Sequence, residues 1–211
     1  MNLRIIVADD HPVVLMGIRM ALCNLTLPSL IVGEAISTDE LMAQLRHQPC
    51  DILITDFSMP NGQLPDGMTM IRRIRRNFPS LKIIVMTMHS NPFIVRDLMK
   101  TGIKGLFDKH QALQELIKAL TCIAQGKTYV SDAFSSALST QQRGDTLHAP
   151  LTGRELEVLR LFGQNQSGRE IAERLNRSEK TISRQKRMAM QKLGIRFNSD
   201  LADYVRETGL V

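Results

Sequence analysis

The sequence predicts an α/β domain with a parallel, doubly wound sheet, followed by a small all-helical domain. Three observations support this prediction. Within about the first 125 residues, five short apolar runs alternate with five segments of helical periodicity. The apolar runs show no polar alternation, which is typical of strands covered on both faces. After residue 150, every periodic segment is helical.

The first domain is expected to contain five βα units. Their strands are predicted at residues 3–8, 30–35, 51–55, 82–87 and 103–107. Their helices are predicted at residues 13–23, 38–47, 68–78, 93–102 and 112–126. Ser37 or Thr38 opens the second helix, and Gly102 ends the fourth. Right-handed crossovers between parallel strands then favour a flavodoxin-like sandwich.

The periodicity lapses between residues 129 and 149, a stretch rich in Ser, Gln and Thr. We interpret it as a linker with room for a short early helix, which places the two domains at residues 1–128 and 150–211. The second domain is expected to have helices at residues 151–163, 167–176, 178–194 and 198–209. Thr152 with Glu155 forms a capping box, and Ser167 and Ser178 open the next two helices.

Composition excludes several protein classes. The chain has 211 residues, 43% of them apolar, and no run reaches the roughly 18 apolar residues of a membrane span. The N-terminal stretch lacks the shape of a signal peptide, so a cytoplasmic location without membrane contact is expected. The three cysteines are widely spaced, which predicts free thiols, and no His/Cys cluster indicates zinc.

Basic residues concentrate in the second domain. The net charge is +6, with +2 over residues 1–150 and +4 over residues 151–211. Residues 177–192 hold six basic side chains against one acidic side chain. This concentration indicates an anionic partner.

Polar side chains lie at or just beyond the ends of four of the predicted strands. Asp9 and Asp10 follow the first strand, Asp56 the third and Lys109 the fifth, while Thr87 ends the fourth. Sites in open parallel sheets lie beyond the carboxyl ends of the strands, so these groups are expected to converge. A strand-end Asp alone is more often a turn former, but their joint placement favours a functional site.

The converging groups indicate phosphoryl chemistry. Three neighbouring carboxylates need a cation, and oxygen ligands suit Mg²⁺. A carboxylate such as Asp56 can act as a nucleophile toward phosphorus. Lys109 can pair first with a carboxylate and then with the phosphoryl group, and the Thr87 hydroxyl can donate to a phosphoryl oxygen.

The motifs "VADDHP", "ITDFSMP", "VMTM" and "GLFDK" resemble the receiver domain of two-component response regulators, over residues 3–126. The resemblance implies that Asp56 is the phosphoacceptor and that a sensor histidine kinase or phosphorelay protein is the donor. It also implies a metal site formed by Asp9, Asp10, Asp56 and the backbone carbonyl of Phe57, with Asp10 the more direct ligand. Thr87 would be the switch hydroxyl and Lys109 the family's lysine.

Two departures from the family pattern are visible. The loop "MPNGQLPDG" is longer than usual, and Leu106 stands where the family has a switch aromatic. The usual coupling of hydroxyl and aromatic is therefore not expected here. The long loop, together with later motifs, is most similar to the RcsB-like regulators.

The second domain carries a helix-turn-helix pattern. Helices 167–176 and 178–194 are joined by a tight turn at Asn176 and Arg177, and the second helix is expected to enter the major groove. Its predicted base-facing side chains are Lys180, Ser183, Arg184 and Arg187. Arg177, Lys186 and Lys192 are predicted to contact phosphates. A solvated charged face is the alternative for the charge run alone.

The motifs "LTGRELEVLRLF", "GREIAERLNRSEKTIS" and "KLGI" resemble the LuxR-type output domain of NarL/FixJ regulators, over residues 150–207. The usual pattern has Lys and His where this chain has Ser183 and Gln185, so a different base preference is expected. In that family the fourth helix mediates dimerisation, and the apolar Leu201, Ala202 and Val205 permit this.

We therefore predict a DNA-binding regulator that acts as a homodimer on double-stranded DNA under control of Asp56 phosphorylation, and not an enzyme. The first alternative is a phosphorylation-independent regulator that acts constitutively or with an auxiliary protein, for instance as a heterodimer. The second is a small phosphatase or phosphotransferase with a strand-end Asp nucleophile and Mg²⁺. Such enzymes place another Asp two residues later, where this chain has Ser58.

Overall fold

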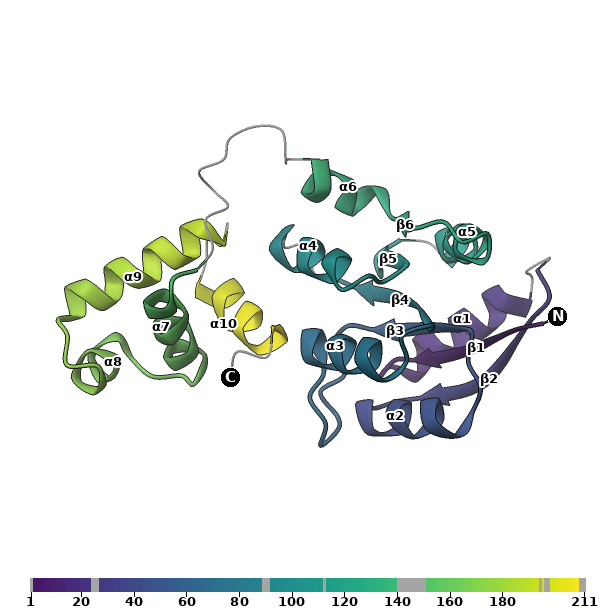
Figure 1. Ribbon diagram of the computed structural model, residues 1–211, viewed down its shortest axis with the longest axis horizontal. Helices are drawn as coiled ribbons and strands as arrows, with labels where there is room; N and C mark the ends of the chain where they lie inside the picture. Colours follow the sequence, from purple (N-terminus) through teal and green to yellow (C-terminus); the bar gives the residue numbers. More distant parts are fainter. Residues whose placement is uncertain are drawn as a thin grey trace.

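In the computed structural model, the first domain is built on a parallel sheet of six strands in the order β2-β1-β3-β4-β5-β6 (Figure 1). The structure describes residues 2–23, 27–88, 92–111, 113–139, 151–193, 195 and 198–208. The strands are β1 (Leu3–Ala8), β2 (Ser29–Ala35), β3 (Ile52–Asp56), β4 (Lys82–Thr87), β5 (Gly105–Asp108) and β6 (Tyr129–Val130). The order reverses between β1 and β3, so the crevice for a site lies at their carboxyl ends.

Helices cover both faces of the sheet, which confirms the doubly wound prediction. Helices α1 (Pro12–Cys23) and α5 (Leu113–Ala124) pack on one face, and α2 (Thr38–His47), α3 (Gly67–Asn77) and α4 (Pro92–Lys100) on the other. Alternate strand residues separate into these two cores. Ile5 and Val7 of β1 belong to the cluster under α1 and α5, whereas Ile6 belongs to the cluster under α2, α3 and α4.

The first part of the predicted linker is folded onto the first domain. Ser131 N–H donates to the carbonyl of Leu106, so β6 extends the sheet beside β5. Helix α6 (Asp132–Ser139) lies against α4, and its Phe134 is buried. A strand of two residues leaves no periodicity in the sequence, which explains why it was not predicted. Residues 140–149 of the predicted linker lie outside the described residues.

The second domain has the four predicted helices, α7 (Gly153–Gly163), α8 (Gly168–Arg174), α9 (Glu179–Lys192) and α10 (Asn198–Glu207). Capping boxes open both α7 and α8. Helix α9 packs against α7 and α8, while α10 lies against α7 and also against α3 of the first domain. None of the described helices has the length and apolar character that a membrane span requires.

The apolar side of α10 is covered in this structure. Leu201 and Val205 are buried, and Ala202 is exposed. The dimerisation surface predicted for α10 would therefore need Leu201 and Val205 to come free of their present packing.

Candidate functional site

The carboxyl edge of the sheet brings together the side chains predicted to meet there. Lys109, which follows β5, places its Nζ 2.7 Å from Asp56 Oδ2 and 2.8 Å from Asp9 Oδ2. Asp9, Asp10, His11 and Asp56 each offer a ligand atom within 4.8 Å of the others. Asp9 is fully buried and Asp56 is 5% exposed. Residues that follow different strands in the sequence thus meet in one compact acidic site.

Burial and ion pairing have opposite effects on the pKa values of Asp56 and Lys109. Burial raises the pKa of Asp56 above its ordinary value, although the hydrogen bond from Lys109 acts to lower it. Burial alone would lower the pKa of Lys109, but its hydrogen bonds to Asp56 and Asp9 outweigh burial and raise it. Lys109 therefore stays charged, and its single positive charge faces three carboxylates.

The donor set fits a hard divalent cation. Three carboxylates with one lysine leave negative charge in a partly buried position, and their oxygens are close enough to share one ion. Mg²⁺ prefers carboxylate oxygens together with retained water. His11 Nδ1 lies 2.8 Å from Asp10 Oδ1 at the exposed margin, so Asp10 is reached from solvent more readily than Asp9.

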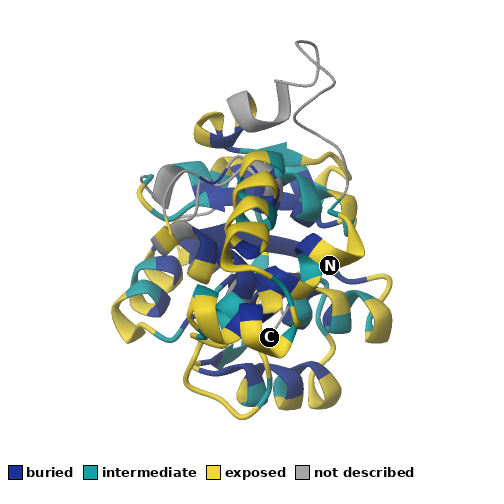
Figure 2. Cartoon of the chain, turned by 90° about the vertical axis from the view of Figure 1, so that its left-hand side faces the viewer, coloured by how far each residue is buried: buried dark blue, intermediate teal, exposed yellow. Residues whose placement is uncertain are grey.

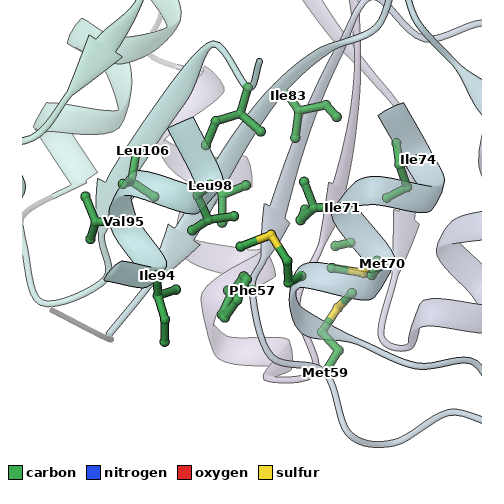
Figure 3. Close-up of a cluster of buried hydrophobic side chains, with 14 of the residues drawn as sticks. Phe57, Met59, Met70, Ile71, Ile74, Ile83, Ile94, Val95, Leu98 and Leu106 are labelled. Atoms are coloured by element: carbon green, nitrogen blue, oxygen red, sulfur yellow. The ribbon is translucent and has the colours of Figure 1, made fainter. Parts of the chain in front are cut away.

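Thr87 and Leu106 occupy neighbouring strands beside the site. Thr87 is buried at the end of β4, and its carbonyl accepts the N–H of Lys109. Leu106 is fully buried and points toward Val95 and Leu98 of α4 (Figure 3). A leucine there fills the space under α4 with aliphatic carbon and carries no polar atom to pair with a rearranged Thr87 hydroxyl.

Phe57 has a different environment from the one expected of a metal ligand. Its side chain is fully buried in the core (Figure 3), and its carbonyl accepts the N–H of Gly67 at 2.9 Å. One lone pair of that carbonyl is thereby directed to the start of α3. The Ser58 N–H instead points back to the site and hydrogen-bonds the Asp56 carboxylate. The metal role of the Phe57 carbonyl stays a prediction.

Two carboxylates hold the long loop between β3 and α3, one closing its base and the other binding its later residues. Asp66 accepts the Ser58 hydroxyl at 3.1 Å and the Met59 N–H at 2.9 Å. Asp39 of α2 accepts the N–H groups of Gln63 at 2.6 Å and Leu64 at 3.2 Å. A Cβ at residue 62 would lie 2.5 Å from Asp39 Oδ2, so a side chain there would displace the carboxylate from its present position. The extra residues thus form an ordered loop and not a slack insertion.

In the second domain, the four predicted base-facing residues lie on one exposed side of α9. Asn176 takes a left-handed conformation (φ 50°) and sets the tight turn between α8 and α9. Figure 2, which views the molecule from the side of these helices, shows mainly exposed residues on the nearest elements. The four base-facing residues predicted from the sequence, all of them exposed, are Lys180, Ser183, Arg184 and Arg187.

Two of the predicted phosphate contacts are engaged elsewhere in the fold. Lys192 Nζ lies 2.8 Å from Glu155 Oε2, and the two side chains are only 16% and 8% exposed. Lys186 lies over the ring of Phe162, 4.1 Å from its centroid, and burial lowers its pKa. Both lysines join α9 to α7 in this structure, and their predicted phosphate role stays a prediction. Arg177, half-buried, donates to Gln185 Oε1 at 3.4 Å.

A groove beside α9 contains residues that the sequence analysis did not single out. It has a volume of about 750 Å³ and runs between the start of α7 and one side of α9. Arg154, Thr181 and Met188 line it together with the predicted Arg184. Arg154 lies in the first turn of α7, directly before Glu155 of the capping box. The capping box was the available signal, since it marks where α7 begins.

Comparisons with known proteins agree with both halves of the chain. The response regulator receiver domain model matches residues 5–121, and the model of bacterial regulatory proteins of the luxR family matches residues 149–205. The transcriptional regulatory protein RcsB of Escherichia coli K12 is 41% identical over 209 residues, covering 99% of this chain and 96% of RcsB. The oxygen regulatory protein NreC of Staphylococcus carnosus is 31% identical over 218 residues, covering 99% of each chain.

Solved structures give the same picture for the whole chain. RcsB of Salmonella enterica serovar Typhimurium, bound to a promoter in the presence of phosphomimetic BeF3-, aligns with a TM-score of 0.87 at 41% identity, covering 98% of this chain and 99% of that chain. A structure of two RcsB dimers bound to two parallel DNAs aligns with a TM-score of 0.80 at 40% identity, with the same coverage.

Proposed function

Because the chain belongs to the response regulators that join a receiver domain to a LuxR-type DNA-binding domain, we propose that phosphorylation of Asp56 controls its binding to promoter DNA. It is a DNA-binding transcription regulator of a two-component system, in a family of regulators and not of enzymes. The observation that carries the role of Asp56 is its position at the end of β3, 2.7 Å from Lys109 and beside two further carboxylates. Because a transcription regulator must reach promoter DNA, we also propose a cytoplasmic location.

The transfer step follows from this geometry. A carboxylate oxygen of Asp56 attacks the phosphorus of a phosphohistidine on the sensor kinase or relay protein. An O–P bond forms, the N–P bond breaks, and the histidine nitrogen retains the electron pair. Lys109 then pairs with a phosphoryl oxygen, and the Thr87 hydroxyl donates to another. Mg²⁺ held by Asp10, Asp56 and Asp9 would supply charge neutralisation for the phosphoryl oxygens.

The DNA-binding step uses the exposed side of α9. Lys180, Arg184 and Arg187 can donate to base edges, and Arg guanidinium favours guanine. As a homodimer, the protein would place two such helices on two half-sites. Phosphorylation would shift an existing equilibrium toward conformers in which α10 leaves α3 and becomes available to a second chain.

Leu106 favours a second candidate function. Because it lacks the ring that usually follows the switch hydroxyl, Asp56 phosphorylation would bias the conformers only weakly. The receiver domain would then serve as a docking surface for an auxiliary regulator in a heterodimer. The complete acidic site favours the first candidate.

DNA affinity with and without acetyl phosphate separates the two candidates. The first predicts that acetyl phosphate with Mg²⁺ tightens binding to a target promoter by about tenfold, in line with typical coupling free energies. Asp56→Asn should abolish this gain and leave the basal affinity intact. Equal affinities under all conditions, with Asp56→Asn indistinguishable from the natural chain, would overturn it in favour of the second.

A further inference from the structure

Helix α3 carries four arginines, and among the residues that the structure describes only Arg75 has a hydrogen-bond partner. Arg75 donates to the carbonyls of Pro79 at 3.1 Å and Leu81 at 3.0 Å, which closes the chain after the helix. The other three arginines project from the outer side of α3. Together with Thr69 they line a shallow hollow of about 430 Å³, formed by Thr69, Arg72, Arg73 and Arg76.

Three other arginines on the surface are paired with carboxylates. Arg4 pairs with Asp51 at 2.7 Å, Arg19 with Glu34 at 2.6 Å, and Arg169 with Glu173 at 3.1 Å. Within the part of the chain that the structure describes, no carboxylate pairs with the three arginines of the hollow. Like charges three and four residues apart on a helix destabilise it.

The cluster is not required for folding the helix. Met70, Ile71 and Ile74 are buried and fix α3 on the sheet, so any polar residues would serve on its outer side. The arginines repel one another and so do not favour the helix that carries them, although the core residues of that helix do. Such local conflicts concentrate at functional sites.

We propose that Thr69, Arg72, Arg73 and Arg76 bind a small, multiply charged phosphate anion such as a free oligophosphate. Guanidinium groups match phosphate oxygens in bidentate pairs, and the Thr69 hydroxyl adds a neutral donor. The four residues span about 10 Å along the helix axis, since each residue rises about 1.5 Å. That length exceeds one phosphate group and suits a chain of two or three.

The proposed anion site and the DNA-reading helix lie in different parts of the molecule. In Figure 1, α3 lies on the opposite side of α7 and α10 from α9. Helices α7 and α10 therefore lie between the hollow on α3 and the helix that would read a duplex. The hollow also lies close to the contact between the two domains, because α10 packs against α3.

Calorimetric titration of the full-length protein with sodium tripolyphosphate at constant ionic strength tests the proposal. Saturable binding of one anion per chain is expected. Arg73→Ala with Arg76→Ala should weaken it by at least about tenfold, since hydrogen bonds to charged groups are lost. The matched control, Arg46→Ala with Lys127→Ala, removes the same charge from exposed positions elsewhere and should change affinity by less than about twofold.

Tyrosine fluorescence provides an independent readout. The chain has no Trp and two Tyr, so Tyr129→Phe leaves Tyr204 as the only strong emitter. Tripolyphosphate should change its emission with the same saturation curve. Absence of saturation, equal loss in the control variant, or an arginine variant that loses promoter affinity but keeps tripolyphosphate affinity would each overturn the proposal. Melting temperatures of both variants establish that they fold.

Discussion

The acidic edge of the receiver domain and the α7–α9 junction of the DNA-binding domain each hold a lysine against a carboxylate. The distances are 2.7 Å for Lys109 to Asp56 and 2.8 Å for Lys192 to Glu155, and the lysine side chains are 12% and 16% exposed. The surroundings differ. Lys109 faces more negative charge than it can balance, whereas Glu155 also accepts the N–H and hydroxyl of Thr152. The uncompensated negative charge around Lys109 is what we expect of a functional site. The charge of Glu155 is compensated by Lys192 and Thr152, as we expect of a structural contact between helices.

Replacing Lys109 by Met should give the largest effect, because the side-chain volume stays and only the positive charge is lost. The carboxylates would then repel each other without compensation, which costs about 2–3 kcal/mol in a partly buried position. Millimolar Mg²⁺ should restore most of that stability. Scanning calorimetry with and without Mg²⁺ measures this, and a receiver transition indifferent to Mg²⁺ would contradict the charge argument.

Replacing Lys192 by Met should give a smaller loss, about 1–2 kcal/mol, because Glu155 keeps its bonds from Thr152. The calorimetric transition of the DNA-binding domain alone should move, and Mg²⁺ should not restore it. Arg160→Met, at an exposed position on α7, serves as the control. If Lys192→Met instead left stability intact and weakened DNA binding in a salt-dependent way, Lys192 would be the phosphate contact predicted from the sequence.

The pair of Arg4 and Asp51 should give the smallest effect. Hydrogen bonds from the Arg4 side chain and N–H lower the pKa of Asp51 to about 2. Since the folded pKa lies below the unfolded value of about 3.9, the stabilisation is present above pH 4 and is lost as pH falls toward 2. Asp51→Asn should lower the melting temperature by roughly 1–2 °C at pH 6, with the difference shrinking near pH 2. A constant difference across that range would show that the ion pair is not its cause.

The sequence was most informative where topology alone decides the outcome. Parallel strands bring their carboxyl ends to one edge, so Asp9, Asp56 and Lys109 could be grouped from strand positions. The destinations of Lys186 and Lys192 could not be predicted in this way. Long side chains reach partners set by helix packing, here Phe162 and Glu155, and the charge run looks the same in either case.

The structure of two short segments, the loop after Asp56 and strand β6, could not be predicted from the sequence for a related reason. The sequence shows that the loop after Asp56 is long, but the conformation of the loop depends on hydrogen bonds to Asp39 of α2. Strand β6 is formed by Tyr129 and Val130 alone, too few residues to show a period. In both places the stabilising partner is distant in the sequence, and local pattern carries no information about it.

Strand β6 has a consequence for how the receiver domain can be isolated. An unpaired strand edge is a template for joining another chain. A fragment ending at residue 128 would lose the N–H of Tyr129 and Ser131, and the carbonyls of Lys104 and Leu106 would face solvent. Removing Phe134 would also open the surface of α4. A fragment ending at residue 139 keeps β5 paired and leaves only the two-residue strand β6 at that edge of the sheet. We therefore expect the shorter fragment to self-associate through β5 more readily than the longer one.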